Sequence, residues 1–365
     1  MTTQDGEIAA CPDDLAENPA VVAWMEINER RELPIAVQTL RRLNGRPNVL
    51  RLVGTGPGRS NVIAKGCQDL VESHVYKDLL PRLGISSPSY YGHTKDARGD
   101  AYWLFIEDAG EEKYSPITTE HQILVSKWLA ELHTSASNLR RPHLLPDRSP
   151  DWFLAYLRSI RSTIELRRPI WAHLGDDATA FQKLTSQCDA LESRWDEVRS
   201  ACEGIPSTLV HCDFVPKNIC VRSSHGRNIL LPFDWEVAGW GNPATDIAHL
   251  IATPGAPRSK STLVVDSRDG VEAYWKTVHE RWSEWNLAFF ERLALVGQIF
   301  RMLLAVNWAL EDPLPSGDRI VSGAPLLEEQ KATMYNRASQ ERSKNWMLSV
   351  LPLYESRLAR MLSML

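Results

Sequence analysis

The order of hydrophobic patterns along the chain is the feature that most limits its fold. Residues 38–66 contain three short β-prone runs, at about 38–44, 48–54 and 60–66, separated by the turn sequences NGRP and GTGPGR. A helical pattern follows over 69–84, and YWLFIED is a fourth β-prone run, apolar enough for the centre of a sheet. We therefore expect an antiparallel meander of three strands, then a helix and one further strand.

Downstream of these runs the pattern is helical, with one interruption. Apolar residues three and four positions apart predict helices within 118–137, 151–166 and 177–204, and again from about 244 to the C-terminus. Residues 205–235 interrupt them with β-prone runs that form a hairpin turning at SSHGR. The sequence thus predicts an α+β, bilobal architecture, with a small antiparallel sheet first and a larger, mainly helical lobe carrying one β hairpin.

The same patterns place the lobe boundaries. We expect residues 1–110 to form the N-terminal lobe and 111–365 the C-terminal lobe, with a hinge at 107–115, because a chain of 365 residues is too long for most single cores. PAVVAWMEINE begins with proline and has the spacing of a short helix. Residues 1–18, which precede it, are expected to be loose, and we assign no role to the first 35 residues.

Composition excludes several classes of protein. The net charge of −5, with dispersed lysines and arginines, supplies no basic surface for nucleic acid. Six cysteines lie far apart without a CxxC pair, which predicts neither a zinc site nor a disulfide framework and fits a reducing cytosol. The acidic N-terminus does not resemble a signal peptide, and no apolar run reaches membrane-spanning length. We expect a cytoplasmic monomer or homodimer that binds neither nucleic acid nor membrane.

Polar residues gather at one end of the predicted hairpin. One arm follows HCDFVPKN and the other ends in FDWE, so pairing of the arms brings Asp213, Asn218 and Asp234 to the same end. Carboxylate and amide oxygens in such a group suit a hard cation such as magnesium better than zinc. Asp213 and Asn218 alone are common turn residues, but a simple turn predicts no matching FDWE.

The spacing of the first motif is more specific. H-x-D-x-x-x-x-N is the pattern of the catalytic loop in kinase-type phosphoryl transfer. From about residue 38 to 254 the sequence resembles the aminoglycoside phosphotransferase and choline kinase family, which has a protein-kinase-like fold. The resemblance rests on HCDFVPKN, FDWE and GNPATDIAHL. Cys212 departs from the family pattern, which has glycine there, but it leaves Asp213 and Asn218 in place.

The resemblance implies roles for the polar residues of the larger lobe. Asp213 matches the catalytic base, and Asn218 and Asp234 match the ligands of a magnesium ion. His211 matches a histidine that shapes the loop, and Asp246 matches an aspartate that hydrogen-bonds the loop. Glu236 is a candidate for a further contact to the metal or to the acceptor.

The smaller lobe contains matching residues. Phosphoryl transfer needs a fixed cation on the nucleotide phosphates, which SNVIAKG offers in Lys65 and the following helix supports with Glu72. ESHVYKDLLP fits the family pattern of that helix. Asn48 lies in NGRPN, where the family has its nucleotide loop, and the backbone of Glu107 and Ala109 would bind the adenine edge at the hinge.

The resemblance implies an O-phosphotransferase that uses ATP or GTP and magnesium to phosphorylate a hydroxyl group of a small molecule. The leading acceptor is an antibiotic (aminoglycoside, nucleoside or macrolide-like), which would make the chain a resistance enzyme. A metabolic sugar or small-alcohol kinase is the alternative, and a catalytically inactive nucleotide-binding scaffold is a third reading. Residues 251–365 carry 14 basic and 13 acidic residues, which favours a less cationic acceptor, and the irregular segment 312–326 leaves room for a ring system.

A protein kinase fits the sequence poorly. Only eleven residues separate Asp234 from Asp246, and no APE-like element occurs between them. This interval is too short for the activation segment on which a protein substrate docks. The sequence therefore favours a small-molecule acceptor.

Overall fold

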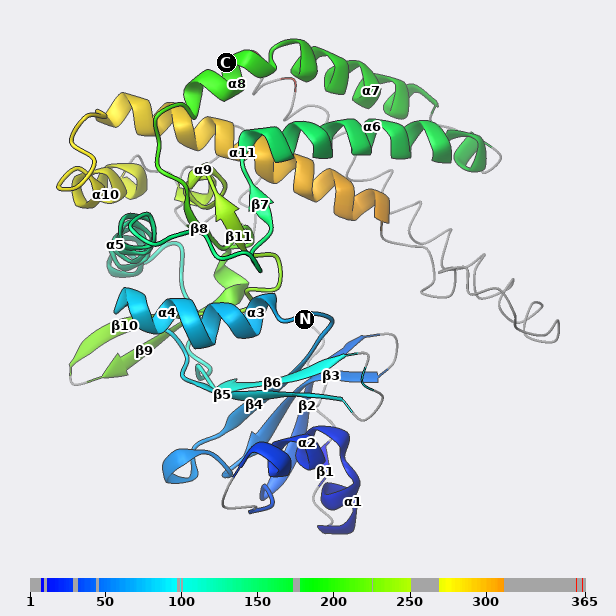
Figure 1. The fold of residues 1–365 in the computed structure, drawn as a ribbon, viewed down its shortest axis with the longest axis vertical. Coiled ribbons are helices and arrows are strands. Elements are labelled where there is room, and N and C mark those ends of the chain that lie inside the picture. The colour runs from blue at the N-terminus through cyan, green and yellow to red at the C-terminus, as the bar shows by residue number, and fades with distance from the viewer. Residues whose placement is uncertain are drawn as a thin grey trace.

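The computed structural model describes residues 8–9, 12–28, 32–43, 46–96, 99, 101–172, 178–224, 226–250, 269–311, 359 and 363. Figure 1 shows a lobe built around a β-sheet and a larger, mainly helical lobe, so the expected α+β, bilobal architecture is confirmed. The predicted ring-accommodating segment at 312–326 lies outside the described residues.

A six-stranded sheet forms the first lobe. Its order is β1-β2-β3-β4-β6-β5, with every neighbouring pair antiparallel. The strands span, in chain order, β1 Ile8–Ala9, β2 Ala36–Leu43, β3 Arg46–Val53, β4 Val62–Cys67, β5 Tyr90–Lys95 and β6 Tyr102–Glu107. The three predicted meander strands are thus β2, β3 and β4, and the predicted fourth strand is β6, which lies inside the sheet between β4 and β5.

The described part of the N-terminal segment is more regular than the sequence indicates. Residues 1–18 were expected to be loose, but Ile8–Ala9 pairs with β2 and Pro12–Glu17 forms helix α1. Helix α2, Pro19–Ile27, begins with proline after the capping side chain of Asn18. Its Trp24 packs with Phe105 in a cluster on the sheet, and such tertiary contacts lie outside what a local pattern can reveal.

The predicted helix at 69–84 is interrupted. It consists of α3, Val71–His74, a π-helical turn, Val75–Leu79, and α4, Leu80–Leu83. Proline at position 81 has no N–H to donate to the carbonyl four residues earlier, which explains why the turn before it widens. The helix ends at Gly84, whose φ of 67° is the left-handed conformation expected at a helix C-terminus.

Helices dominate the second lobe, with short strands between them. The helices are α5 Thr119–Ala136, α6 Pro150–Ala172, α7 Ala178–Ser193, α8 Trp195–Ala201, α9 Ala244–Ile247, α10 Asp269–Val278 and α11 Leu287–Glu311. The strands are β7 Asp147–Arg148, β8 Thr208–Val210, β9 Ile219–Ser224, β10 Arg227–Pro232 and β11 Gly239–Gly241. Short 3-10 turns occur at Pro57–Arg59, Pro216–Asn218 and Ala248–Leu250.

The predicted β island has two parts. β9 and β10 form the expected hairpin, while β8 pairs instead with β11, which in turn pairs with β7. The sequence indicated neither β7 nor β11, because strands of two or three residues are too short to show an alternating pattern. This small sheet lies directly before HCDFVPKN and shortly after FDWE, so it supports both motifs.

One hydrophobic core connects the two lobes. It contains Leu104 and Ile106 of β6, Leu79 beside the sheet, and residues of α5 and α11 such as Leu129 and Phe300, all buried. A second cluster lies between α2 and the sheet. Because the main core includes residues from both lobes, packing holds the sheet and the helical lobe in a defined arrangement.

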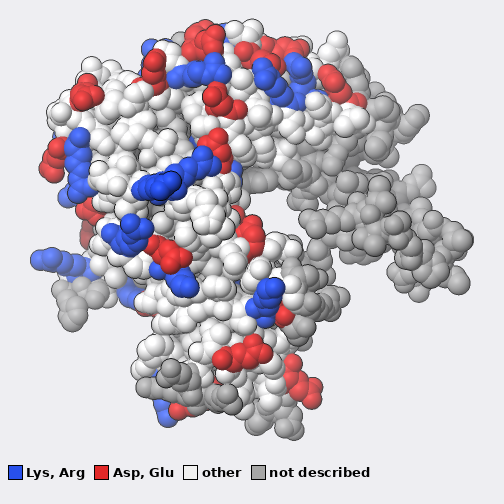
Figure 2. Space-filling model, in the orientation of Figure 1, with Lys and Arg blue, Asp and Glu red and all other residues white. Residues whose placement is uncertain are grey.

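Two further observations concern the charged surface and the helices. On the face drawn in Figure 2, acidic and basic side chains are interspersed rather than gathered in a single basic patch. Among the helices in the described part of the chain, none is both long and apolar enough to cross a membrane.

Helix α11 approaches α9 closely at Gly297. A Cβ atom at this position would lie 1.8 Å from the carbonyl oxygen of Ala244. Gly297→Ala should therefore push α9 and α11 apart and lower the stability by about 1–3 kcal/mol, measured as a fall in thermal midpoint. Gly58→Ala is the control, because that glycine has φ of 63° but nothing within 4 Å of the added carbon. A larger loss at position 58 than at position 297 would contradict this packing.

Candidate active site

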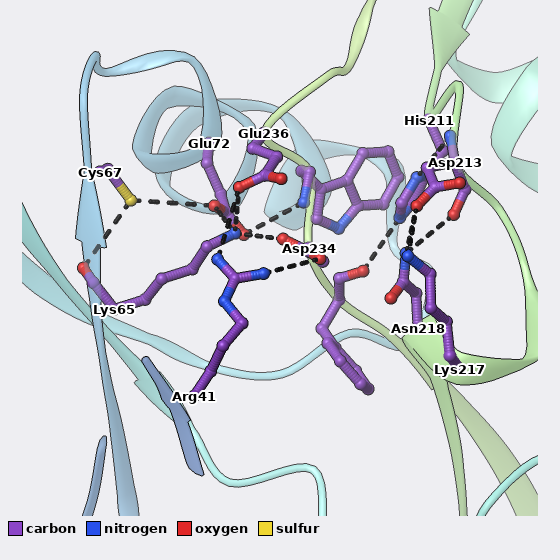
Figure 3. Close-up of polar contacts among 12 residues, drawn as sticks. Arg41, Lys65, Cys67, Glu72, His211, Asp213, Lys217, Asn218, Asp234 and Glu236 are labelled. Atoms are coloured by element: carbon purple, nitrogen blue, oxygen red, sulfur yellow. Dashed lines mark hydrogen bonds and ion pairs between the residues drawn. The ribbon is translucent and has the colours of Figure 1, made fainter. Parts of the chain in front are cut away.

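Lys65 lies in the centre of the first sheet and points toward the second lobe. It is on β4 between Val49 of β3 and Leu104 of β6, and it is 5% exposed. Its Nζ lies 2.6 Å from Oε2 of Glu72, and it also contacts Asp234 of the second lobe (Figure 3). Burial disfavours the ammonium form, but these carboxylates outweigh burial and raise the pKa of Lys65 above its usual range. Lys65 is therefore a fixed cation at neutral pH.

Glu72 connects the two lobes. Its Oε2 accepts the hydrogen bond from Lys65, and its Oε1 accepts one from the backbone N–H of Trp235, at 3.0 Å. The carboxylate is buried, which raises its pKa, although Lys65 opposes this effect. The structure thus brings together Lys65 and Glu72, as expected, and adds a contact from Glu72 to the FDWE segment.

A buried aspartate, Asp246, holds the backbone of the loop at 211–218. Oδ2 of Asp246 accepts the N–H of His211 at 2.8 Å, and Oδ1 accepts the N–H of Cys212 at 2.9 Å. Nε2 of His133 lies 3.3 Å from Asp246, and Nδ1 of His133 lies 2.9 Å from the hydroxyl of Tyr274. Burial alone would raise the pKa of Asp246, but the hydrogen bond from His133 and the charges nearby lower it.

His211 connects the loop to the FDWE segment that follows β10. Its Nε2 donates to the carbonyl oxygen of Phe233 at 3.1 Å, and its Nδ1 accepts the N–H of Asp213 at 3.3 Å. This pattern requires the neutral ring, and burial correspondingly lowers the pKa of His211. The ring also packs against Trp235, with centroids 4.4 Å apart. His211 thus shapes the loop and has no free nitrogen for chemistry.

Cys212 adopts a conformation that favours glycine. Its φ is 63°, in the left-handed region that non-glycine residues rarely occupy, and its side chain is buried. The hydrogen bond of its N–H to Asp246 holds it there. Glycine adopts this conformation without strain, whereas cysteine at this position carries a cost in backbone strain.

Asp213 lies between two cations. Its Oδ1 is 3.1 Å from Arg301 of α11, and its Oδ2 is 3.2 Å from Nζ of Lys217. Burial alone would raise the pKa of Asp213, but Arg301 and then Lys217 outweigh it and lower the pKa. Asp213 is therefore ionised at neutral pH, as a proton acceptor has to be. The sequence did not indicate Arg301, because it lies 88 positions away on another helix.

Asn218 presents opposite sides of its amide to different partners. Its Nδ2 donates to the backbone oxygen and to Oδ2 of Asp213, both at 3.0 Å. The amide oxygen consequently points away from Asp213, and Asn218 lines a cavity that Asp234 also lines. Hard oxygen donors of this kind suit magnesium, which takes one or two protein carboxylates and completes its shell with water and phosphate.

Asp234 lies between the Lys65 group and the loop at 211–218 (Figure 3). Its φ is 71°, a left-handed conformation that aspartate tolerates better than most residues. Burial alone would raise its pKa, but Lys65 outweighs burial and lowers it. Glu236 is half exposed and contacts Lys65 at 3.2 Å. Three carboxylates around Lys65 leave negative charge that favours a cation, so Asn218 and Asp234 fit the magnesium ligands implied by the sequence.

In the described part of the chain there is no cluster of three or more His, Cys, Asp or Glu side chains that could hold a metal by itself. Glu236 is not among the residues that line the cavity.

A cavity of about 400 Å³ opens between the sheet and the β9–β10 hairpin. Its size is within the range of ligand sites. Part of its wall is apolar and part is charged or polar. The apolar residues include Leu40, Val49, Ile63, Ile106, Ala109 and Phe233, and the charged and polar ones include Arg41, Lys65, Glu72, Lys217, Asn218 and Asp234. A cavity with an apolar wall beside fixed charges is suited to a ligand that has a flat base and phosphate groups.

The predicted hinge residues line this cavity. Ala109 is 8% exposed and packs against Cys220 and Leu231. The side chain of Glu107 is held by Arg222 and Ser89, and its N–H donates to the carbonyl oxygen of Ser89 at 2.8 Å. The N–H of Glu107 is therefore already engaged. An adenine edge would have to use the other backbone groups of the hinge.

Asn48 is not brought to the cavity. Its side chain is on β3 and faces Gly66, where an added Cβ would lie 2.7 Å from Oδ1 of Asn48. Asn48 is therefore beside the neighbouring strand, whereas Arg41 of β2 lines the cavity. Arg41 lies at a register shift between β2 and β3, and such irregularities redirect side chains. Its guanidinium is 4.0 Å from Asp234 and 3.9 Å from Glu236.

Comparison with known proteins identifies a family. A model of the phosphotransferase enzyme family matches residues 72–285, more than half of the chain. No curated protein matches the sequence significantly.

Solved structures show a similar fold. A choline kinase from Cryptosporidium parvum Iowa II superimposes with a TM-score of 0.53 at 11% identity, covering 92% of each chain. An ethanolamine kinase from Plasmodium vivax has a TM-score of 0.49 at 16% identity and covers 88% of this chain and 84% of its own. The ternary complex of streptomycin, ATP and APH(2'')-IIa has a TM-score of 0.49 at 12% identity, with 84% and 93% covered. The first of these shows that the chain shares the fold of a choline kinase.

The backbone of Cys212 leads to a direct test. Cys212→Gly removes the strain of a left-handed Cβ, whereas Cys212→Ala keeps that strain and also loses the sulfur. The glycine variant should therefore be more stable than the alanine variant by about 1 kcal/mol in urea unfolding. At a position with ordinary backbone angles alanine would be the more stable of the two, and that order would contradict the conformation described for the loop.

Proposed function

The chain belongs to the phosphotransferase enzyme family, and on this premise we propose that it transfers the γ-phosphoryl group of ATP or GTP to a hydroxyl group of a small molecule. One observation carries the proposal. An ionised aspartate on a strained loop, Asp213, and a fixed lysine on a sheet, Lys65, lie on either side of Asp234, near one cavity (Figure 3).

The cavity supports a nucleotide with its base against the apolar wall and its phosphates near the charged residues. In this arrangement Lys65 binds the phosphates, and Glu72 keeps its ammonium in place. Arg41, which faces the same cavity, supplies a second positive charge to the phosphates. The backbone at Glu107 and Ala109 lies where the base would bind.

Asn218 and Asp234 would hold magnesium. When bound, magnesium neutralises charge on the phosphate oxygens. The carboxylate of Asp234 is already paired with Lys65, but Lys65 also pairs with Glu72 and Glu236. The negative charge of these carboxylates is therefore only partly neutralised, which leaves room for a cation. His211 and Asp246 act indirectly: they fix the backbone of the loop that carries Asp213 and Asn218.

Asp213 acts as the general base in the proposed reaction. Its carboxylate accepts the proton of the acceptor hydroxyl as the acceptor oxygen bonds to the γ-phosphorus. The bond from the γ-phosphorus to the bridging oxygen breaks, and the nucleoside diphosphate leaves with that oxygen. A carboxylate held by buried partners needs little reorganisation, which is a recognised source of catalytic rate.

For the acceptor, we propose a hydroxyl-bearing antibiotic, with a metabolic sugar or small alcohol as the alternative. The charges around Asp213 favour an acceptor that has no ammonium group beside the reacting hydroxyl, because Arg301 and Lys217 would repel it. This supports a nucleoside-like, macrolide-like or sugar acceptor over an aminoglycoside. We expect the enzyme to act in the cytoplasm, as a monomer or homodimer.

The test is a screen with ATP and magnesium across hydroxyl-bearing antibiotics, sugars and small alcohols, with phosphorylated product detected by mass. Asp213→Asn should lower the rate of product formation about 10²–10⁴-fold and leave ADP affinity nearly unchanged, because it removes the proton acceptor but not the nucleotide contacts. Asp151→Asn is the matched control, since that carboxylate is 75% exposed and pairs with Arg199 on the surface.

Two results would contradict the proposal. One is full turnover by Asp213→Asn with any acceptor that the wild type phosphorylates. The other is tight nucleotide binding without product from any acceptor class, which would favour a nucleotide-binding scaffold.

The metal assignment has its own test. Asp234→Asn keeps a residue that tolerates the left-handed backbone but removes the negative charge, so the magnesium concentration for half-maximal activity should rise at least tenfold, about 1.4 kcal/mol in binding. It is measured by titrating magnesium into enzyme treated with a chelator. Glu236→Gln should shift the requirement less, because Glu236 is half exposed and does not line the cavity. An unchanged magnesium requirement in Asp234→Asn would exclude Asp234 as a ligand.

A further inference from the structure

Both carboxylate oxygens of Asp213 are already engaged. Oδ1 accepts from Arg301 at 3.1 Å, while Oδ2 accepts from Nδ2 of Asn218 at 3.0 Å and forms an ion pair with Lys217 at 3.2 Å. A general base has to come within about 2.6–3.2 Å of the hydroxyl that it deprotonates. Oδ2 already accepts two of these contacts, so a hydroxyl that approaches Oδ2 has to displace Asn218 or Lys217.

The exposure of the three side chains indicates which one leaves. The side chain of Arg301 is 14% exposed and also donates to the carbonyl oxygen of Cys212, and Asn218 is 3% exposed. The side chain of Lys217 is 69% exposed. An exposed ion pair contributes little to stability, so Lys217 is the partner that a hydroxyl can displace most easily.

The displaced ammonium has a suitable place to go. Lys217 lines the same cavity as Lys65, Asn218 and Asp234, where the proposed function puts the nucleotide phosphates. Its backbone is fixed in the 3-10 turn Pro216–Asn218, directly beside Asn218. Its flexible side chain can therefore move from Asp213 to an oxygen in the cavity without any change in the loop.

We propose that Lys217 is a second catalytic residue, whose ammonium rests on Asp213 when no acceptor is bound and moves to the transferring phosphoryl group when a hydroxyl takes its place. The inference rests on the proposed function and adds a role for this lysine. As the acceptor oxygen bonds to the γ-phosphorus, its proton passes to Oδ2 of Asp213 and the bond to the bridging oxygen of ADP breaks. Lys217 then stabilises negative charge on the phosphoryl oxygens, where electrostatic stabilisation is most effective.

The experiment uses MgATP, with water as the acceptor, so that no natural acceptor has to be known. Single-turnover hydrolysis and calorimetric MgADP affinity are compared for the wild type, Lys217→Met, Lys217→Arg and Lys276→Met. The last is the matched control, because Lys276 is an exposed lysine in an ion pair with Glu272 at the same i,i+4 spacing, on α10. A thermal midpoint for each variant checks folding.

We expect Lys217→Met to slow hydrolysis about 100-fold with an unchanged MgADP affinity, and Lys217→Arg to recover most of the loss. Lys276→Met should behave as the wild type. A Lys217→Met rate within threefold of the wild type overturns the inference but not the proposed function. A loss of MgADP affinity equal to the loss of rate also overturns it, since Lys217 would then only bind nucleotide. If the wild type hydrolyses no MgATP, the same comparison is made with an acceptor from the screen, and an enzyme that phosphorylates none of them overturns both.

Discussion

The buried carboxylate of Glu72 is the contact on which the site depends. It accepts a hydrogen bond from Lys65 of the sheet and another from the backbone of Trp235 in the helical lobe. Removing one partner of a buried pair leaves an uncompensated charge, at a cost of about 3–5 kcal/mol. The same group therefore sets the position of Lys65 and the position of the segment that contains Asp234. The two lobes contribute to one site because a single carboxylate contacts both.

Asp246 has the corresponding role on the other side of the site. It receives two backbone N–H groups from the loop and a hydrogen bond from His133, and it holds Cys212 in a left-handed conformation. This tight turn is followed by Asp213, whose carboxylate lies beside Arg301 and Lys217. Strain in the backbone is thus compensated by buried hydrogen bonds, as is common where a catalytic group is held in place.

Much of this arrangement could be predicted from the sequence. The β-then-helical order predicted the α+β, bilobal architecture. The motifs and the family resemblance pointed to Asp213, Asn218, Asp234, Lys65 and Glu72, which the structure places together. Local patterns could not reveal Arg301, because its contact with Asp213 depends on how α11 packs. The position of Arg41 at the cavity depends on an irregular register between β2 and β3. Asn48 belongs to a turn sequence, but its side chain faces Gly66 of the neighbouring strand. Lys217 lies within the motif, but the role proposed for it rests on its exposure beside Asp213, which the sequence does not reveal.

The central claim is that the sheet and the loop form a single phosphoryl-transfer site, and a crystal structure with magnesium and a non-hydrolysable ATP analogue tests it most directly. We predict the base in the apolar part of the cavity, the phosphates on Lys65, and a metal bound by the amide oxygen of Asn218 and the carboxylate of Asp234. A nucleotide bound outside this cavity, or a metal that contacts neither residue, would contradict the claim.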